Sequence, residues 1–138
     1  MLKLKKFPLC GTSNHLYMPF RGRLIKTQQA RSFDQLIHIY KIKSIEAVSN
    51  WKRELGPNSI FNVDCVFVFK REKIYTKKHT IKKLDTSNRL KQTLDGLALI
   101  LDIDDSRFVS GSYSKSYCDN GDEYVDIEIS ETELKECK

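Results

Sequence analysis

Residues 84–108 read LDTSNRLKQTLDGLALILDIDDSRF, and this stretch predicts one amphipathic helix over residues 86–101. Its leucines recur at a spacing of three or four residues, which places them on one helical face. These leucines are Leu90, Leu94, Leu97 and Leu101. Asp85 or Thr86 can cap the helix start, because a short side-chain oxygen accepts a hydrogen bond from a free N–H of the first turn. Gly96 costs about 1 kcal/mol relative to alanine inside a helix, so we expect close packing there.

A polar stripe and a group of acids accompany this predicted helix. Asn88, Lys91 and Asp95 share a narrow arc beside the leucine face. Three acids follow the helix, and they are Asp102, Asp104 and Asp105. Acids at a helix C-terminus oppose the macrodipole and repel one another unless solvent or a cation screens them. A solvated acidic turn is the plainer interpretation, and bound Mg²⁺ or Mn²⁺, which prefer oxygen ligands, is the alternative.

The rest of the chain is basic. Its 138 residues carry a formal net charge of +6 and are 40% hydrophobic, which fits one domain with a buried core and excludes a disordered chain. No apolar run approaches the roughly 20 residues that a membrane span needs. A basic surface attracts nucleic acid by neutralising phosphates, although ordinary surface lysines explain the charge alone equally well. The candidate DNA-binding residues in and before the helix are Lys77, Lys78, Lys82, Lys83 and Arg89.

The order of the predicted elements indicates a single α+β domain over residues 1–138, with two helices packed on a mainly antiparallel mixed sheet. We expect strands over 2–9, 24–26, 60–70, 107–118 and 122–129, and helices over 28–55 and 86–101. Asn120-Gly121 favours a type I′ turn, which would join the last two strands as a hairpin. The expected irregular parts are a loop over 11–23, a basic flexible segment over 71–83 and a frayed tail over 131–138.

The cysteines and histidines predict no metal site of their own. The spacing of Cys10, Cys65, Cys118 and Cys137 matches neither a zinc site nor a disulfide framework, so we expect free thiols in a reducing cytoplasm. The three histidines are scattered and are expected to pack or lie on the surface. No long apolar segment follows the basic N-terminus, and we therefore expect no signal peptide.

The acidic helix motif resembles that of a known family. Residues 85–95 follow the pattern D-x-x-N-x-x-K-x-x-x-D, and Asp104-Asp105 come after it. This pattern is similar to the core motif of the RusA-type endodeoxyribonucleases, the Holliday junction resolvases common in phages and prophages. Residues 12–17, which read TSNHLY, and residues 21–23, which read RGR, resemble the P-S-N-x-x-Y and R-G-R elements of the same family. The resemblance extends from about residue 7 to residue 130.

The resemblance implies a RusA-like fold and a cytoplasmic homodimer, associated with the nucleoid when it binds four-way DNA junctions. It also implies that two opposing strands are cut by hydrolysis that depends on Mg²⁺ or Mn²⁺. The catalytic residues would be Asp85, Lys91 and Asp105, the metal ligands Asp85, Asn88, Asp104 and Asp105, and the N-terminal DNA contacts Asn14, Tyr17, Arg21 and Arg23. Alternatively, Asn14 closes a turn. The alternative role of Lys91 is an ion pair with Asp95 on the helix surface.

If these residues are the metal ligands, side-chain oxygens from the two ends of one helix should converge on one ion. A metal ion there would polarise a phosphoryl oxygen and lower the pKa of an attacking water, while Lys91 stabilises charge on the phosphate. Ser87 departs from the family pattern, which has a second aspartate at that position. One alternative is therefore a non-catalytic or weakly active dimer that binds branched DNA with the same fold. Another is a nuclease for flaps or other branches.

Overall fold

The computed structural model describes residues 1–11, 17–84 and 86–137. The strands are β1 (Leu2–Pro8), β2 (Tyr17–Phe20), β3 (Arg23–Lys26), β4 (Ile60–Lys70), β5 (Phe108–Cys118) and β6 (Tyr124–Thr132). The helices are α1 (Gln28–Lys43), α2 (Ile45–Lys52), α3 (Arg71–Ile74) and α4 (Ser87–Leu101), followed by the 3-10 turn η2 (Asp105–Arg107). The predicted strand over residues 60–70 is confirmed, and the predicted helix over residues 86–101 is confirmed to within one residue.

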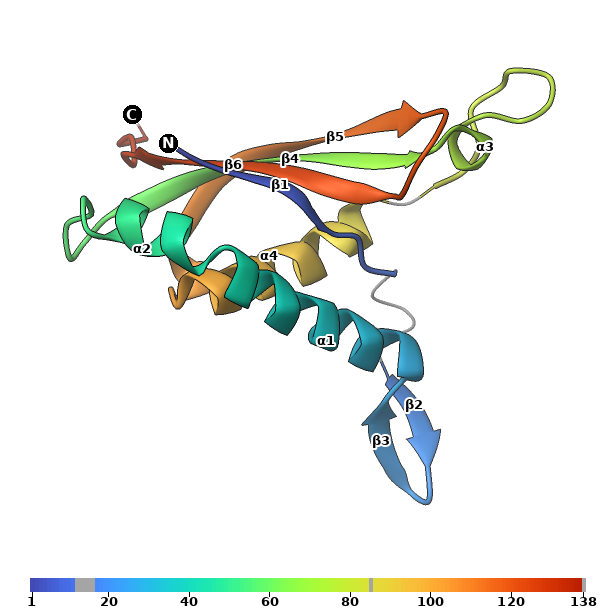
Figure 1. The fold of residues 1–138 in the computed structure, drawn as a ribbon, viewed down its shortest axis with the longest axis horizontal. Helices are drawn as coiled ribbons and strands as arrows, with labels where there is room; N and C mark the ends of the chain where they lie inside the picture. The colour runs from blue at the N-terminus through green and yellow to red at the C-terminus, as the bar shows by residue number, and fades with distance from the viewer. Residues whose placement is uncertain (12–16, 85, 138) are drawn as a thin grey trace.

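The main sheet has four strands in the order β1-β6-β4-β5. β6 is antiparallel to both β1 and β4, whereas β5 is parallel to β4. The prediction of an α+β fold with a mainly antiparallel mixed sheet is therefore confirmed. The sheet is a single layer, with α1, α2 and α4 gathered on one side of it (Figure 1).

The prediction that the last two strands form a hairpin is wrong, because β4 lies between β5 and β6. β4 alternates buried and half-buried residues along most of its length, whereas β5 is exposed over most of its length. β4, the most apolar strand, therefore lies inside the sheet and pairs with a strand on each side. The polar strand β5 is left at the edge of the sheet. The chain between β5 and β6 still turns at Gly121 with φ of 103°, but it crosses the end of β4.

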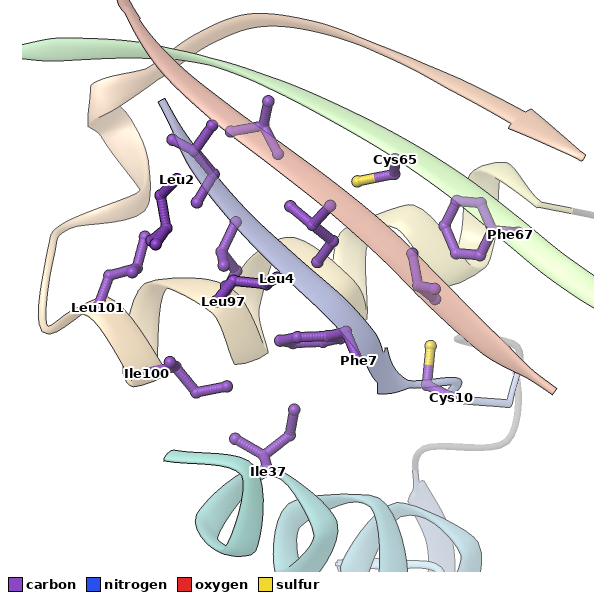
Figure 2. Packing of buried hydrophobic residues seen from close by; sticks show 14 of the residues in the cluster. Leu2, Leu4, Phe7, Cys10, Ile37, Cys65, Phe67, Leu97, Ile100 and Leu101 are labelled. Atoms are coloured by element: carbon purple, nitrogen blue, oxygen red, sulfur yellow. The ribbon is translucent and has the colours of Figure 1, made fainter. Parts of the chain in front are cut away.

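The core lies between the sheet and the helices. In Figure 2, Leu4 and Phe7 of β1 point toward Leu97 of α4 and Ile37 of α1. All four side chains are buried. Each fully buried side chain of this size contributes about 1.5–3 kcal/mol relative to exposure, so this layer accounts for much of the stability that holds α4 in place.

Gly96 lies where α4 meets α1. A Cβ at this position would fall 2.8 Å from Cδ1 of Ile37 and 3.6 Å from Cζ of Phe33. The absence of a side chain therefore lets the two helices approach each other closely. This contact confirms the expectation of close packing at Gly96, and it explains why α4 carries a residue of poor helix propensity.

The single helix predicted over residues 28–55 is in fact two helices, which meet at Ser44. The Ser44 hydroxyl donates to the backbone oxygen of Tyr40 at 2.8 Å, and the Ser44 N–H donates to the same oxygen at 2.9 Å. Serine hydroxyls that compete for helical carbonyls bend or end helices. The apolar periodicity continues through Val48 and Trp51, which are both buried, and it therefore concealed the break.

The predicted loop over residues 11–23 contains a strand that the sequence analysis missed. β2 and β3 form a separate two-stranded sheet that projects from the body of the protein (Figure 1). Arg21 and Gly22 connect the strands with φ values of 49° and 74°. Two positive φ angles in a two-residue connection are typical of a type I′ turn.

Two expected irregular segments are more ordered than predicted. Ile74 is buried at the end of α3, so the start of the basic segment 71–83 belongs to the core. Tyr75 and Ile81 form an isolated antiparallel bridge, which closes the following loop. At the C-terminus, β6 continues to Thr132 and includes the first residues of the predicted tail.

The end of α4 carries an acid in the left-handed conformation. Asp102 has φ of 52° and ψ of 51°. Its N–H donates to Leu99, and the N–H of Ile103 donates to Ala98 at 3.1 Å, which is the Schellman arrangement. Glycine adopts this conformation without the steric cost of a Cβ, and replacing the acid also removes a negative charge from a helix C-terminus.

We therefore expect Asp102→Gly to raise the free energy of unfolding by about 0.5–1 kcal/mol. Urea denaturation monitored by circular dichroism would measure it. Asp102→Asn is the matched control, because it removes the charge and keeps a side chain that tolerates the left-handed region. It should stabilise less. A lower stability of Asp102→Gly than of the unmodified protein would contradict this account.

Candidate nucleic-acid and metal site

Side chains of α4 bind the segment that follows β1. The Arg89 guanidinium donates to the backbone oxygen of Cys10 at 2.6 Å, and the Gln92 amide donates to that of Gly11 at 3.0 Å. The first turns of α4 therefore lie beside the chain that leads into residues 12–16. The predicted site residues Asn14 and Asp85 lie outside the described residues.

Arg89 has a packing role that the sequence analysis did not foresee. Besides its bond to Cys10, its guanidinium lies over the Phe69 ring, 5.3 Å from the ring centroid. Arg89 is half-buried and ties the start of α4 to the end of β4. Because this guanidinium is already engaged in packing, the assignment of Arg89 to DNA contact stays a prediction.

The polar stripe of α4 faces away from the core. Lys91 and Asp95 are exposed, and Asn88 is half-buried. Within the described residues, no ion pair joins Lys91 to Asp95, so the structure does not support the alternative of a helix-surface pair. Lys91 is thus accessible to an anion that approaches the first half of α4.

Asp104 and Asp105 lie at the opposite end of α4. Both are exposed, and Asp105 begins η2. The backbone N–H of Ser106 donates to Asp104 Oδ1 at 2.9 Å, and bonds from Ser106 hold the pKa of Asp104 below its usual value. Arg107 anchors this turn by donating from Nε to the backbone oxygen of Ser59 at 2.7 Å. Asp104 therefore stays ionised near neutral pH, and both acids are held in an ordered turn.

The length of α4 corrects the expected convergence of acids. The helix has 15 residues. At 1.5 Å per residue this separates its two ends by about 22 Å. Thr86 precedes the helix and Asp104 follows it, so within one chain the residues at the helix start and the late acid pair cannot ligate one ion. Among the described residues, no group of three or more histidine, cysteine or acidic side chains could hold a metal.

The basic segment and the start of α4 lie at the same end of the molecule. The chain between β4 and α4 carries exposed lysines, which are Lys77, Lys78, Lys82 and Lys83. Thr76 closes this loop, since its oxygen accepts from Lys78 at 3.3 Å and from Thr80 at 3.2 Å. The loop projects beyond the sheet near α3 (Figure 1). This arrangement concentrates positive charge on the chain that leads into α4, as a phosphate-binding surface requires.

The β2–β3 hairpin carries the other predicted contacts. Tyr17, Arg21 and Arg23 are all exposed, and the Arg21 guanidinium lies 5.2 Å from the centroid of the Phe20 ring. The hairpin also exposes apolar side chains that the sequence analysis did not consider, including Leu24 at 74%.

A cleft of about 390 Å³ separates the hairpin base from the helices. Lys26 pairs with Asp34 at 2.6 Å across its wall, which raises the pKa of Lys26, and Asp95 of α4 also lines it.

The cysteines are free thiols, as predicted. Burial raises the pKa of Cys10, and it raises that of Cys65 to about 12, with a further contribution from the charge of Asp64. These two thiols therefore stay protonated and cannot serve as nucleophiles near neutral pH. None of the helices in the described ranges is long and apolar enough to cross a membrane.

A basic loop, an exposed lysine and separate acidic residues on an α+β domain are features of a protein that acts on a polyanion. The sequence matches the family model "Endodeoxyribonuclease RusA" over residues 7–130, and the chain therefore belongs to this family of endodeoxyribonucleases. No curated protein matches the sequence significantly.

Proposed function

We propose that this protein is a metal-dependent endonuclease that resolves four-way DNA junctions by paired phosphodiester hydrolysis. The match to the RusA family over residues 7–130 carries this proposal. The basic loop that leads into α4 supports it, because a nuclease site needs cations that hold the phosphodiester backbone. Lys77 and Lys78 in this loop, together with Lys91, would supply those charges.

We infer that the working unit is a homodimer with two shared sites. The 22 Å axial length of α4, at about 1.5 Å per residue, keeps the two ends of one helix apart. A two-fold axis crossing the helix would set two copies of α4 antiparallel, so that the start of each lies beside the end of the other. Each site would then combine Asp85 of one protomer with Asp105 of its partner.

The donor set of such a shared site suits Mg²⁺ or Mn²⁺, because it consists of carboxylate and amide oxygens. Asp85, Asn88, Asp104 and Asp105 are the proposed ligands. When bound, the ion would polarise a phosphoryl oxygen and lower the pKa of a bound water. Lys91 would stabilise charge that develops on the phosphate, and the lysines of the basic loop would hold the flanking backbone.

The alternative is a branched-DNA-binding dimer with little or no cleavage, since Ser87 stands where the family pattern has an aspartate. Serine lacks the negative charge of a carboxylate and is a poorer ligand for Mg²⁺. A flap nuclease is a second alternative. Incubating a labelled four-way junction, a flap and a linear duplex with Mg²⁺, Mn²⁺ or EDTA separates them. Metal-dependent paired nicks in the junction support the proposal, and binding without product under any metal supports the alternative.

We expect Asp105→Asn to reduce junction cleavage by at least about 100-fold, because loss of groups that only orient metal ligands already costs 10–100-fold. Gel-shift titration should show unchanged or tighter junction binding. Asp102→Asn is the matched control, since it removes an exposed carboxylate at the same helix end, and it should cut normally. Normal cleavage by Asp105→Asn would show that this residue is not a ligand.

A further inference from the structure

Two half-exposed tyrosines lie on β5, the strand at one edge of the main sheet. Tyr113 and Tyr117 are 49% and 43% exposed. In the register of the parallel ladder they lie beside Cys65 and Phe69 of β4, which are buried in the core. Tyr113 and Tyr117 therefore belong to the inner face of the sheet, but at its uncovered edge. Lys115 lies between them on the same face, because successive strand residues alternate in direction.

A third ring and an arginine extend this surface. Tyr75, just after α3, meets Tyr117 edge to face with a centroid distance of 5.5 Å. The Arg71 guanidinium lies 5.8 Å from the Tyr75 centroid and 5.5 Å from that of Tyr117. We define Arg71, Tyr75, Tyr113, Lys115 and Tyr117 as the tyrosine strip. It combines aromatic faces with positive charges over two elements that are distant in sequence.

The charge around the strip favours a polyanion. Residues 70–83 contain seven lysine or arginine residues and one glutamate. Some of this charge is neutralised, since Arg71 pairs with Asp119 at 3.8 Å and Lys73 pairs with Glu123. In the described part of the chain, no ion pair engages Lys77, Lys78 or Lys115. A protein partner that covered the strip would have to supply the matching acids.

Aromatic rings interleaved with basic side chains are the chemistry that binds nucleic acid bases freed from a duplex. Successive bases stack on the rings, and lysine or arginine holds the connecting phosphates. The bases of a paired duplex already stack on one another, so they cannot stack on the tyrosine rings. The strip therefore suits unpaired bases, which occur where strands leave or exchange at a branch.

We propose that the tyrosine strip binds unpaired bases of branched DNA, apart from the cleavage site. The proposal rests on the proposed function for its substrate, but binding at the strip needs neither the metal nor the acids of α4. It adds a second contact that distinguishes an open branch from continuous duplex. The strip lies near the basic loop, so one DNA strand can engage both.

The test uses the full-length protein in EDTA, so that cleavage plays no part. The probes are a fluorescent oligothymidine strand and a junction carrying 2-aminopurine at its branch. We expect Tyr113→Ala and Tyr117→Ala each to weaken oligothymidine binding by about tenfold or more, the usual effect of losing one stacked base. Both should also lower the change in 2-aminopurine fluorescence on binding. Tyr113→Phe and Tyr117→Phe keep the ring and should bind normally.

Ser112→Ala is the matched control, because Ser112 lies on β5 on the opposite face and contacts Asp64 rather than the strip. It should leave both signals unchanged. Tyr117→Ala also removes the packing of Tyr117 on Tyr75 and could disturb the fold. Tyr113 takes no part in that contact, so Tyr113→Ala tests base binding without this complication. Unchanged oligothymidine affinity in Tyr113→Ala and Tyr117→Ala overturns the proposal. A shift to monomer in light scattering for the alanine variants also overturns it, since the strip would then be an interface between copies. If the unmodified protein binds oligothymidine through the strip but cuts no junction when Mg²⁺ or Mn²⁺ is added, that result counts against the proposed function and leaves the strip proposal standing.

Discussion

A mixed dimer made from two inactive chains, Asp85→Asn and Asp105→Asn, is expected to nick four-way junctions at about half the wild-type rate. Each variant alone should be inactive, because both sites of its dimer lack a ligand. In the mixed dimer, one site combines both substitutions and is dead. The other combines the intact Asp85 of one chain with the intact Asp105 of its partner. Activity should therefore reappear without any new interaction.

The mixed dimer can be isolated by co-expressing the two chains with different affinity tags and purifying through both. Nicked junction should accumulate without paired resolution, because only one of the two strands meets a complete site. As a control, a doubly tagged dimer in which one chain carries both substitutions and the other neither should be inactive at both sites. If sites were formed within single chains, the pattern would reverse. The doubly substituted pairing would then nick, and the singly substituted pairing would be dead.

The second large effect is expected at Gly111, an exposed glycine on β5. A Cβ built at this position would clash with the backbone carbonyl of Val63 on β4. Backbone atoms in the middle of a ladder cannot move aside as a flexible side chain can. We expect Gly111→Ala to lower the free energy of unfolding by roughly 3 kcal/mol, the upper range for overpacking, and to lower the melting temperature by about 10 °C.

Differential scanning calorimetry would measure this change, and Gly56→Ala is the matched control. A Cβ at Gly56 meets nothing nearer than the Ser59 hydroxyl at 3.7 Å. Its melting temperature should therefore change by no more than about 2 °C, as for most surface substitutions. Equal, small effects at both glycines would show that β5 can move away from β4 at little cost.

The sequence by itself determined the parts of this protein that depend on local pattern. The leucine spacing of residues 86–101 and the β-branched and aromatic run over residues 60–70 predicted α4 and β4, because periodicity and propensity act over a few residues. Gly96 predicted close packing, because a helix carries a residue of poor propensity only where a side chain would not fit. The family motif located Asp85, Lys91 and Asp105 along the chain. The predicted helix already implied that its start lies far from the late acid pair. The expectation of a metal site within one chain overlooked the rise of about 1.5 Å per residue along that helix.

The tertiary structure decided what depends on competition between distant segments. The Asn120-Gly121 turn predicts a hairpin, but β4 buries more apolar surface at the centre of the sheet and displaces β5 to the edge. The hydroxyl of Ser44 ends α1 within an unbroken apolar pattern. Arg89, which the sequence offered as a DNA contact, also bonds to Cys10, a neighbour that only folding provides. The tyrosine strip likewise exists because the fold brings Tyr75 to Tyr117, and no local pattern encodes which strand is left uncovered.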